Sequence, residues 1–205
     1  DLEDLHAAEP GELLYPRLRA NLTKQGYALI GSHSGVKICR WTKSGRGDCY
    51  KHTFYNISSF QCMEMTPSLA CANKCVFCWR HHTNPVGKSF EWKVDPPEFL
   101  VENFIKAHQG MIKPLRGVPG VKPERYAEAM KHCALSLVGE PIMYPEINKF
   151  VGLLHARQIS TFMVTNAQHP DRIRQLRPVT QLYLSIDAAT KDELTAIDRP
   201  LFEDF

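Results

Sequence analysis

From His132 onward, short apolar runs alternate with segments of helical periodicity. The runs are HCALSLVGEP, ISTFMVTNA and TQLYLSIDA, and helices are expected near Tyr144–Arg157, Asp171–Leu176 and Lys191–Ile197. Strands that alternate with helices form parallel sheets, and continuously apolar strands are buried on both faces. We expect TPSLA (66–70) to add a fourth strand. The pattern predicts an α/β fold, a partial (βα) TIM-type barrel that is incomplete at the C-terminus.

The first part of the chain has a different character. Residues 1–35 predict an acidic lead-in and a helix around Tyr15–Gln25 that ends at Gly26, and residues 36–61 form a basic segment that we expect to be rich in loops. A long helix is expected at Glu98–Lys113, followed by a basic loop. Because the sheet would end on an unpaired edge, we expect the chain to be a piece of a longer polypeptide.

Three of the seven cysteines share one short loop. Cys71, Cys75 and Cys78 form C-x3-C-x2-C, with Phe77 just before the last cysteine. Three such thiolates can hold three corners of a cubane iron–sulfur cluster and leave the fourth iron open. Zinc sites more often combine a cysteine pair with a second, distant pair or with histidines, so the triplet fits zinc less well.

The cysteine count and the apolar runs also bear on location. An odd number of cysteines, three of them clustered, favours metal ligation in a reducing compartment over a disulfide framework, so a cytoplasmic protein is expected. No run approaches the roughly 18 apolar residues of a membrane span, and the acidic N-terminus is unlike a signal peptide. The formal charge of +3 permits an anionic partner without identifying one.

The C-x3-C-x-aromatic-C pattern resembles the signature of the radical S-adenosylmethionine (SAM) superfamily. The resemblance implies a six-stranded partial barrel and a [4Fe–4S] cluster on Cys71, Cys75 and Cys78, whose open iron binds SAM for cleavage to a 5′-deoxyadenosyl radical. Gly139 and Glu140, in the sequence GEP, resemble the motif that holds the SAM amino group, whereas the alternative is a turn with a solvated glutamate.

Polar residues also follow the next two strands of the predicted sheet. They are Thr165, Asn166, Ser185 and Asp187. At the mouth of a barrel they could bond the ribose, the carboxylate or the substrate, and ordinary capping of strand ends is the alternative.

Cys39, Cys49 and Cys62 lie upstream of the triplet. The stretches around them, GVKICRW and CYKHTFY, together with LVGEPIMYPEIN and VTNAQ, resemble the radical SAM domain of the 4-demethylwyosine synthase family, which acts in tRNA wybutosine synthesis. The resemblance runs from residue 24 to the end and implies a second [4Fe–4S] cluster on these cysteines. One spacing departs from the family's twelve: nine residues separate Cys39 from Cys49, whereas twelve separate Cys49 from Cys62. Small buried hydrophobes are the alternative role.

Lys51 matches a lysine that archaeal members are proposed to use as a Schiff base with pyruvate. An amine becomes nucleophilic when desolvation or nearby positive charge lowers its pKa. A solvated lysine is one alternative. Electrostatic binding of a carboxylate or phosphate, together with Arg40, Lys43, Arg46 and His52, is another.

The resemblance implies a radical SAM carbon–carbon lyase that condenses N1-methylguanosine of phenylalanine tRNA with pyruvate. The deoxyadenosyl radical would abstract hydrogen from the N-methyl group. The methylene radical would attack the carbonyl of pyruvate, and loss of the carboxyl carbon and of water would give 4-demethylwyosine. Pyruvate is expected either on the second cluster or on Lys51. Eukaryotic members also carry a flavodoxin-like domain that binds FMN. Nothing in residues 1–35 resembles a flavin-binding βα unit, so FMN is expected only in such a domain and an external or fused flavodoxin-type reductant is expected.

The implied organisation has two parts. Residues 1–35 are a linker remnant with the N-terminal helix, and residues 36–205 are the radical SAM domain, with the second-cluster segment at 36–62 and the first βα units at 63–205. Candidate tRNA contacts are Arg80, His81, His82, Lys88, Trp92 and the 113–125 loop, while Trp79 is expected to shield the cluster. The competing functions are a zinc-binding RNA module that adds His81 or His82 to the triplet, and a radical SAM enzyme with another substrate.

Overall fold

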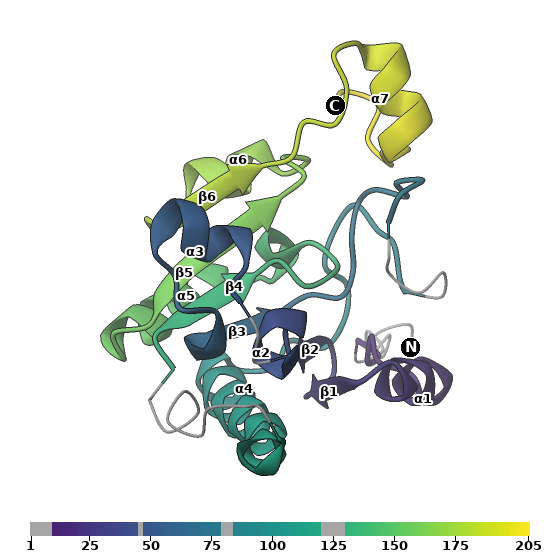
Figure 1. Cartoon of the computed structure of the whole chain (residues 1–205). Coiled ribbons are helices and arrows are strands. Elements are labelled where there is room, and N and C mark those ends of the chain that lie inside the picture. The colour runs from purple at the N-terminus through teal and green to yellow at the C-terminus, as the bar shows by residue number, and fades with distance from the viewer. Residues whose placement is uncertain (1–9, 45–46, 79–83, 120–129) are drawn as a thin grey trace, which may run out of the picture.

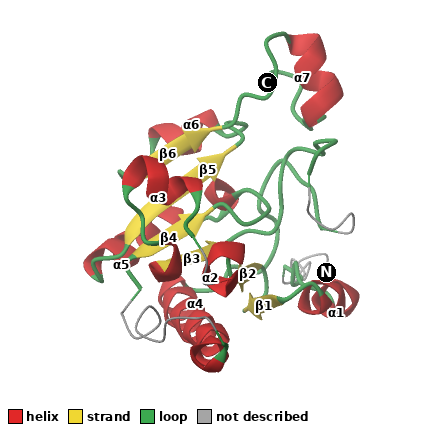
Figure 2. Ribbon diagram, in the orientation of Figure 1, coloured by secondary structure: helices red, strands yellow, loops and turns green. Residues whose placement is uncertain are grey.

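The computed structural model describes residues 10–44, 47–78, 84–119 and 130–205. Within these residues the strands form one six-stranded sheet whose order follows the chain from β1 to β6 (Figures 1 and 2). The strands are β1 (Tyr27–Ile30), β2 (Ser34–Lys37), β3 (Cys62–Thr66), β4 (His132–Leu135), β5 (Ser160–Thr165) and β6 (Gln181–Leu184). The first three pair antiparallel, and β3 to β6 pair parallel, as expected for a partial α/β barrel.

Seven α-helices and three 3-10 turns surround this sheet in the described ranges. They are α1 (Pro16–Lys24), α2 (Arg40–Ser44), α3 (Tyr50–Tyr55), α4 (Pro97–Ile112), α5 (Ile147–Ala156), α6 (Pro170–Arg174), α7 (Lys191–Asp198), η1 (Ser59–Gln61), η2 (Lys113–Gly117) and η4 (Pro141–Met143). The predicted helix at Glu98–Lys113 is confirmed as α4. Helix α5 begins later than expected, because a turn that contains Pro145 occupies the start of the predicted segment.

Helix α1 confirms the expected N-terminal helix. Pro16 occupies the first turn, where its missing N–H costs nothing, and Gly26 follows the C-cap with a φ of +83°. The prediction placed no strand in the next residues, yet β1 and β2 form an antiparallel hairpin there. Each has only four residues in a glycine-rich stretch, so no periodicity marked them. The predicted boundary at residue 35 falls within β2.

The first parallel strand is not the predicted one. TPSLA (66–70) contributes only Thr66 to β3, which is formed by CMEMT upstream. Pro67 has no N–H to donate to the sheet, so the strand ends before it. The expected loop-rich segment at 36–61 also needs correction, because it contains the end of β2 and the helices α2 and α3.

The sheet separates two apolar layers. On one face Met63, Met65 and Leu135 pack with residues of α4 and α5, including Phe104 and Phe150. The alternate residues of the strands point to the opposite face. There Cys62, Ala134 and Phe162 form a smaller cluster, and Tyr55 of α3 packs against Phe162 and Tyr183. Helices α2 and α3 lie in front of the strands on this side in Figure 1.

Helix α7 lies away from β6 and close to the loop that follows β3, at the top of Figure 1. The sheet order leaves β6 as an edge strand, and Leu184 is 49% exposed. None of the described helices is both long enough and apolar enough to cross a membrane.

Candidate functional site

The cysteine triplet lies in the loop that follows β3. Cys71 opens the loop, and its carbonyl accepts a hydrogen bond from the N–H of Gly87 at 3.2 Å. All three cysteine side chains are partly exposed. In barrels of parallel strands, ligands bind at the carboxyl ends of the strands, which is where this loop begins.

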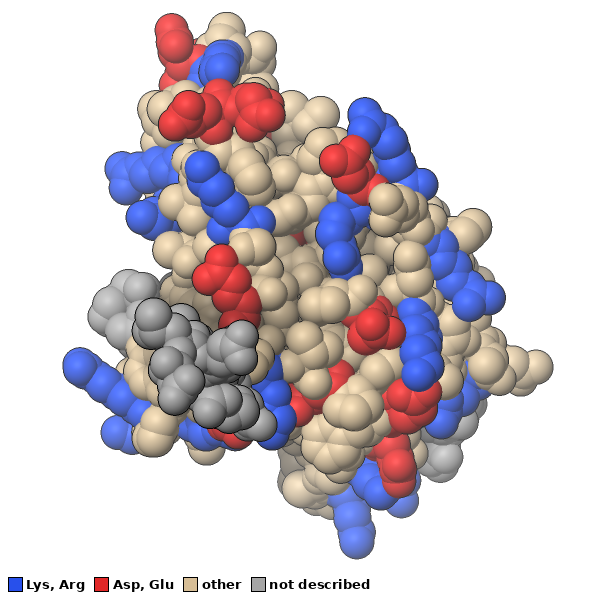
Figure 3. All heavy atoms as spheres, turned by 180° about the vertical axis from the view of Figure 1, so that it is seen from behind, with Lys and Arg blue, Asp and Glu red and all other residues tan. Residues whose placement is uncertain are grey.

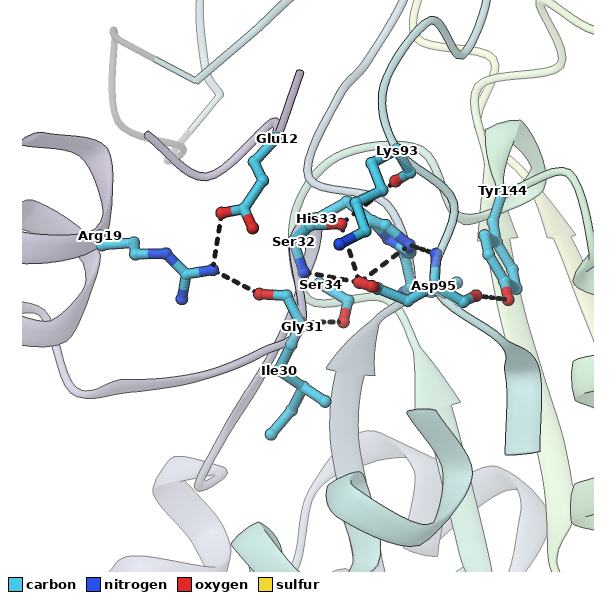
Figure 4. Close-up of polar contacts among 11 residues, drawn as sticks. Glu12, Arg19, Ile30, Gly31, Ser32, His33, Ser34, Lys93, Asp95 and Tyr144 are labelled. Atoms are coloured by element: carbon cyan, nitrogen blue, oxygen red, sulfur yellow. Dashed lines mark hydrogen bonds and ion pairs between the residues drawn. The ribbon is translucent and has the colours of Figure 1, made fainter. Parts of the chain in front are cut away.

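A buried histidine anchors the chain on both sides of this loop (Figure 4). Nδ1 of His33 lies 2.6 Å from the carbonyl oxygen of Pro67, and Nε2 accepts a hydrogen bond from the N–H of Asp95 at 3.0 Å. The carbonyl of His33 also accepts from the N–H of Leu69 at 3.1 Å, and the Tyr144 hydroxyl donates to the carbonyl of Asp95 at 2.6 Å. The loop is therefore fixed at its entrance and at its exit by the β1–β2 hairpin.

The end of α7 holds the middle of the loop. The N–H of Val76 donates to the carbonyl of Ile197 at 2.8 Å, and the N–H of Lys74 donates to that of Asp198 at 3.0 Å. The Asp198 side chain is buried, and its carboxylate hydrogen-bonds to the Cys75 thiol. Burial, followed by this contact, raises the pKa of Cys75 to about 12. No sequence pattern marked Asp198, because its role depends on a tertiary contact.

The GEP turn packs directly on the residues that lead into the loop. The N–H of Glu140 donates to the carbonyl of Ala70 at 2.7 Å. Gly139 has a φ of +74°, and a Cβ there would overlap the carbonyl oxygen of Ser68. Glycine is thus required both by the left-handed backbone and by the close approach of the two segments.

The Glu140 carboxylate is buried between the ends of β4 and β5. It accepts hydrogen bonds from the N–H of Asn166 at 2.8 Å and from the N–H of Ile142 at 3.4 Å. Burial raises the pKa of Glu140 to about 7, although these donors and Thr165 favour the charged form. A carboxylate has lone pairs for more than these donors, so it can also accept from a ligand amine.

One cavity of about 180 Å³ joins the predicted residues. It is lined by Cys71, Cys75, Cys78, Gly139, Glu140, Thr165, Asn166, Ser185 and Asp187, with Phe77 and Leu137 among the other lining residues. The Asn166 side-chain amide also donates to the Cys71 sulfur at 3.4 Å. The structure thus brings together the triplet and every strand-end residue singled out in the sequence.

A second cavity of about 470 Å³ lies against α2 and α3. Its lining includes Cys39, Cys49, Lys51 and Glu64. Cys62 is buried next to it and interacts electrostatically with all four of these residues. Leu137 lines this cavity as well as the first, so one side chain lies in the wall of both.

Lys51 points into an aromatic and acidic surrounding. Its Nζ lies 5.0 Å from the ring centre of Tyr50 and 5.4 Å from that of Phe162. Burial lowers the pKa of Lys51, but the opposing influence of Cys62, Tyr50, Glu64 and Cys49 leaves it raised. These neighbours therefore favour the protonated form of Lys51.

The thiols suit an iron–sulfur cluster in their donor chemistry. Burial raises the pKa of Cys62 to about 12 and also raises that of Cys39, so metal binding must displace their protons. Cys49 accepts a hydrogen bond from the Ser59 hydroxyl at 3.3 Å. Among the described residues no three Cys, His, Asp or Glu side chains form a ready-made ligand group for a single metal ion. The ligand roles therefore rest on donor type and on the shared cavities.

Several residues singled out in the sequence either lie outside the described ranges or have an environment that differs from the predicted one. Trp79, Arg80, His81, His82, Arg46 and residues 120–125 lie outside the described ranges. Trp92 packs against the apolar cluster around α1 and contacts Phe90 edge to face, so it is a packing residue more than an exposed stacking platform. Lys88 lies 5.6 Å from the ring centre of Phe202 and lines a cavity of about 670 Å³ beside α6.

Solved structures and sequence relatives resemble this chain closely. A structure of TYW1 with a lysine–pyruvate adduct bound superposes with a TM-score of 0.81 and 33% identity, over 92% of this chain and 63% of that one. A crystal structure of archaeal TYW1 gives a TM-score of 0.71 and 32% identity, over 88% of this chain and 62% of that one.

Among curated relatives, the S-adenosyl-L-methionine-dependent tRNA 4-demethylwyosine synthase TYW1 of Xenopus laevis is 70% identical over 96% of this chain, and that of Homo sapiens is 68% identical over the same share. The enzyme of Arabidopsis thaliana is 67% identical over 95% of the chain. The chain spans only 28% of the length of the two animal proteins and 31% of the plant one.

A family model provides the broader assignment. Residues 65–205, more than half of the chain, match the model of the radical SAM superfamily. This segment contains the cysteine triplet, the GEP turn and the four parallel strands apart from the first residues of β3. The chain therefore belongs to the radical SAM superfamily.

Proposed function

We propose that this chain is the radical SAM domain of a tRNA-modifying enzyme that condenses N1-methylguanosine with pyruvate to form 4-demethylwyosine. The observation that carries the proposal is the pair of cavities lined by thiols and joined at Leu137. The relatives' names support the reaction, and the lysine–pyruvate adduct in the similar solved structure supports the substrate.

In this proposal the first cavity serves SAM and its cluster. The three thiols of the triplet would hold three irons of a [4Fe–4S] cluster, which with SAM supplies a 5′-deoxyadenosyl radical. Glu140 would accept a hydrogen bond from the SAM amino group. Asn166, Ser185 and Asp187 would bond its remaining polar groups, because they line the same wall.

The second cavity would serve pyruvate. Cys39, Cys49 and Cys62 would hold the second cluster, and Lys51 would either form an imine with pyruvate or pair with its carboxylate. The shared wall at Leu137 would keep the pyruvate carbonyl close to the radical and away from bulk water. The substrate would be phenylalanine tRNA, and a flavodoxin-type partner carrying FMN would provide electrons. We assign residues 36–62 to the second cluster, residues 63–205 to the barrel, and the protein to the cytoplasm.

The test is product formation by the anaerobically reconstituted chain. It should convert methylated phenylalanine tRNA, pyruvate and SAM into the wyosine base when a chemical or flavodoxin reductant is present, and Cys75→Ala should abolish this. Borohydride should trap one pyruvate on the wild type and none on Lys51→Ala if Lys51 forms the imine, with Lys24→Ala, at an exposed position of α1 outside both cavities, as the matched control. A colourless protein that binds zinc tightly would instead support the RNA-binding module, and SAM cleavage without the wyosine base would indicate another substrate.

A further inference from the structure

One short segment carries a marked excess of positive charge. Residues 37–56 contain five Lys and Arg (Lys37, Arg40, Lys43, Arg46 and Lys51) and one acidic residue, Asp48, which gives +4. The whole chain carries +3, so all the remaining residues together carry −1. Such a local excess points to an anionic partner at this segment.

Exposed aromatic side chains stand among these charges. Trp41 on α2 is 41% exposed, and on α3 Tyr50 is 50% and Phe54 is 71% exposed. Arg40 and Lys43 on α2 are also exposed. Helices of five and six residues have little stability of their own, so such side chains would be expected to pack inward if they served only the fold.

The opposite side of the molecule carries charges of both signs. Figure 3 views the protein from behind, and there Asp and Glu side chains stand among the Lys and Arg side chains. Exposed Lys side chains on α4 and α5 include Lys106 and Lys149, which pair with Glu102 at 2.6 Å and Glu98 at 2.7 Å. No ion pair of the described residues involves Arg40 or Lys43.

The same helices border the second cavity. Arg40, Trp41, Lys43 and Tyr50 line it together with Lys51. A partner seated on α2 and α3 would therefore lie at the entrance to the proposed pyruvate site. Unpaired RNA is bound by surfaces on which cationic side chains contact phosphates and neighbouring aromatic side chains stack on bases.

We infer that Arg40, Trp41, Lys43, Tyr50 and Phe54, the α2–α3 face, dock the unpaired loop of an RNA. Arg40 and Lys43 contact phosphates, and Trp41 and Phe54 stack on bases. This inference rests on the proposed function and adds to it the surface that holds the tRNA. An acidic protein would pair with the cations but would leave the exposed rings without stacking partners.

Direct binding tests the inference without catalysis. The probe is a labelled anticodon stem-loop RNA that contains N1-methylguanosine, titrated with the metal-free and the reconstituted chain in the absence of SAM and pyruvate. Trp41→Ala/Phe54→Ala should weaken binding by about tenfold or more. Arg40→Ala/Lys43→Ala should reduce the slope of log affinity against log salt by roughly 1.4, about 0.7 for each phosphate contact.

Matched controls lie on other elements. Phe99→Ala removes a ring that is 43% exposed on α4, and Lys24→Ala removes an exposed cation from the last turn of α1; both should leave affinity within about twofold of the wild type. Phe54→Ala alone serves if the double variant misfolds, because its ring is 71% exposed.

The outcomes separate the docking surface from the reaction. The inference is overturned if the α2–α3 variants bind the RNA like the wild type, if Lys113→Ala/Arg116→Ala loses binding in their place, or if the α2–α3 variants lose only reduction by an acidic flavodoxin. Each of these leaves the proposed reaction intact. A wild-type chain that binds no RNA would overturn both the docking surface and the tRNA substrate.

Discussion

The backbone N–H of Asp95 donates a hydrogen bond of 3.0 Å to Nε2 of His33. The carbonyl of Pro67 can only accept, so Nδ1 of the same ring carries the proton that lies in the 2.6 Å contact. Burial lowers the pKa of His33, although the carbonyl of Pro67 and the charge of Asp95 oppose the shift. The structure thus requires one neutral tautomer of His33, at the point where both ends of the loop that contains the cysteine triplet meet.

Replacing His33 should therefore loosen the loop. His33→Ala leaves a buried carbonyl and a buried N–H without partners, so we expect the free energy of unfolding to fall by about 2 to 4 kcal/mol in urea titrations. His33→Asn keeps one donor for Pro67 and should lose less. An effect of His33→Ala no larger than that of His52→Ala, at an exposed position, would contradict this account.

Gly139 should tolerate no side chain. Gly139→Ala forces a Cβ against the carbonyl of Ser68 at a φ of +74°, so we expect it to destabilise the chain by about 2 to 4 kcal/mol and to lower iron retention after reconstitution. Gly110→Ala is the control, since a Cβ there meets nothing within 4 Å and α4 should gain about 0.5 to 1 kcal/mol. Equal melting temperatures for the two variants would refute the close-approach argument.

Glu140 should make the metal-free, ligand-free chain less stable as the pH rises. Its pKa is near 4.5 when unfolded and about 7 when folded, so the folded state holds the proton more tightly. The stabilisation is complete below about 4.5 and is lost as the pH rises through about 7. Glu140→Gln should remove this loss in urea titrations from pH 4.5 to 8, whereas Glu146→Gln, at an exposed position, should retain it.

His108 should have the opposite dependence. Burial lowers its pKa from 6.5 to about 4, and its ring nitrogens have no hydrogen-bond partner among the described residues. The unfolded chain binds the proton more tightly, so stability is complete above about 6.5 and is lost as the pH falls through about 4. His108→Leu should remove a loss of about 3 kcal/mol over this range, as followed by acid unfolding. If His108→Leu and the wild type unfold at the same acidic pH, this role of His108 is refuted.

Iron content should divide between the two thiol sets. Two clusters give about eight irons per reconstituted chain, and Cys75→Ser or Cys49→Ser should each retain about four. Cys133→Ala should retain about eight, because Cys133 is buried in the main core and lines neither cavity. Loss of all iron in Cys49→Ser, with the fold intact by circular dichroism, would argue against independent clusters.

The part of the fold and of the candidate site that could be predicted from the sequence differs between elements. Strands β4, β5 and β6 were predictable because each is a continuous apolar run followed by polar residues. The same pattern identified Glu140 and Asn166, since the ends of parallel strands meet at one edge of the sheet. Whether they bind SAM stays a prediction.

Other features depend on contacts that sequence patterns do not encode. The hairpin of β1 and β2 is stabilised by pairing with β3, and α2 and α3 are too short to show a period. TPSLA was predicted as a strand from its apolar character, and its residues are buried. They nevertheless lie in a loop, because β3 ends before Pro67, whose carbonyl contacts His33. The approach of Asp198 to Cys75 joins residues from distant parts of the chain.

Leu137 is 1% exposed and belongs to the walls of both cavities. A change of volume at this one position alters both cavities at once, so evolution cannot vary this side chain for one cavity without changing the other. In the proposed reaction, shortening Leu137 to admit a bulkier keto acid would also enlarge the cavity assigned to the sulfonium, so the second change would need its own compensation.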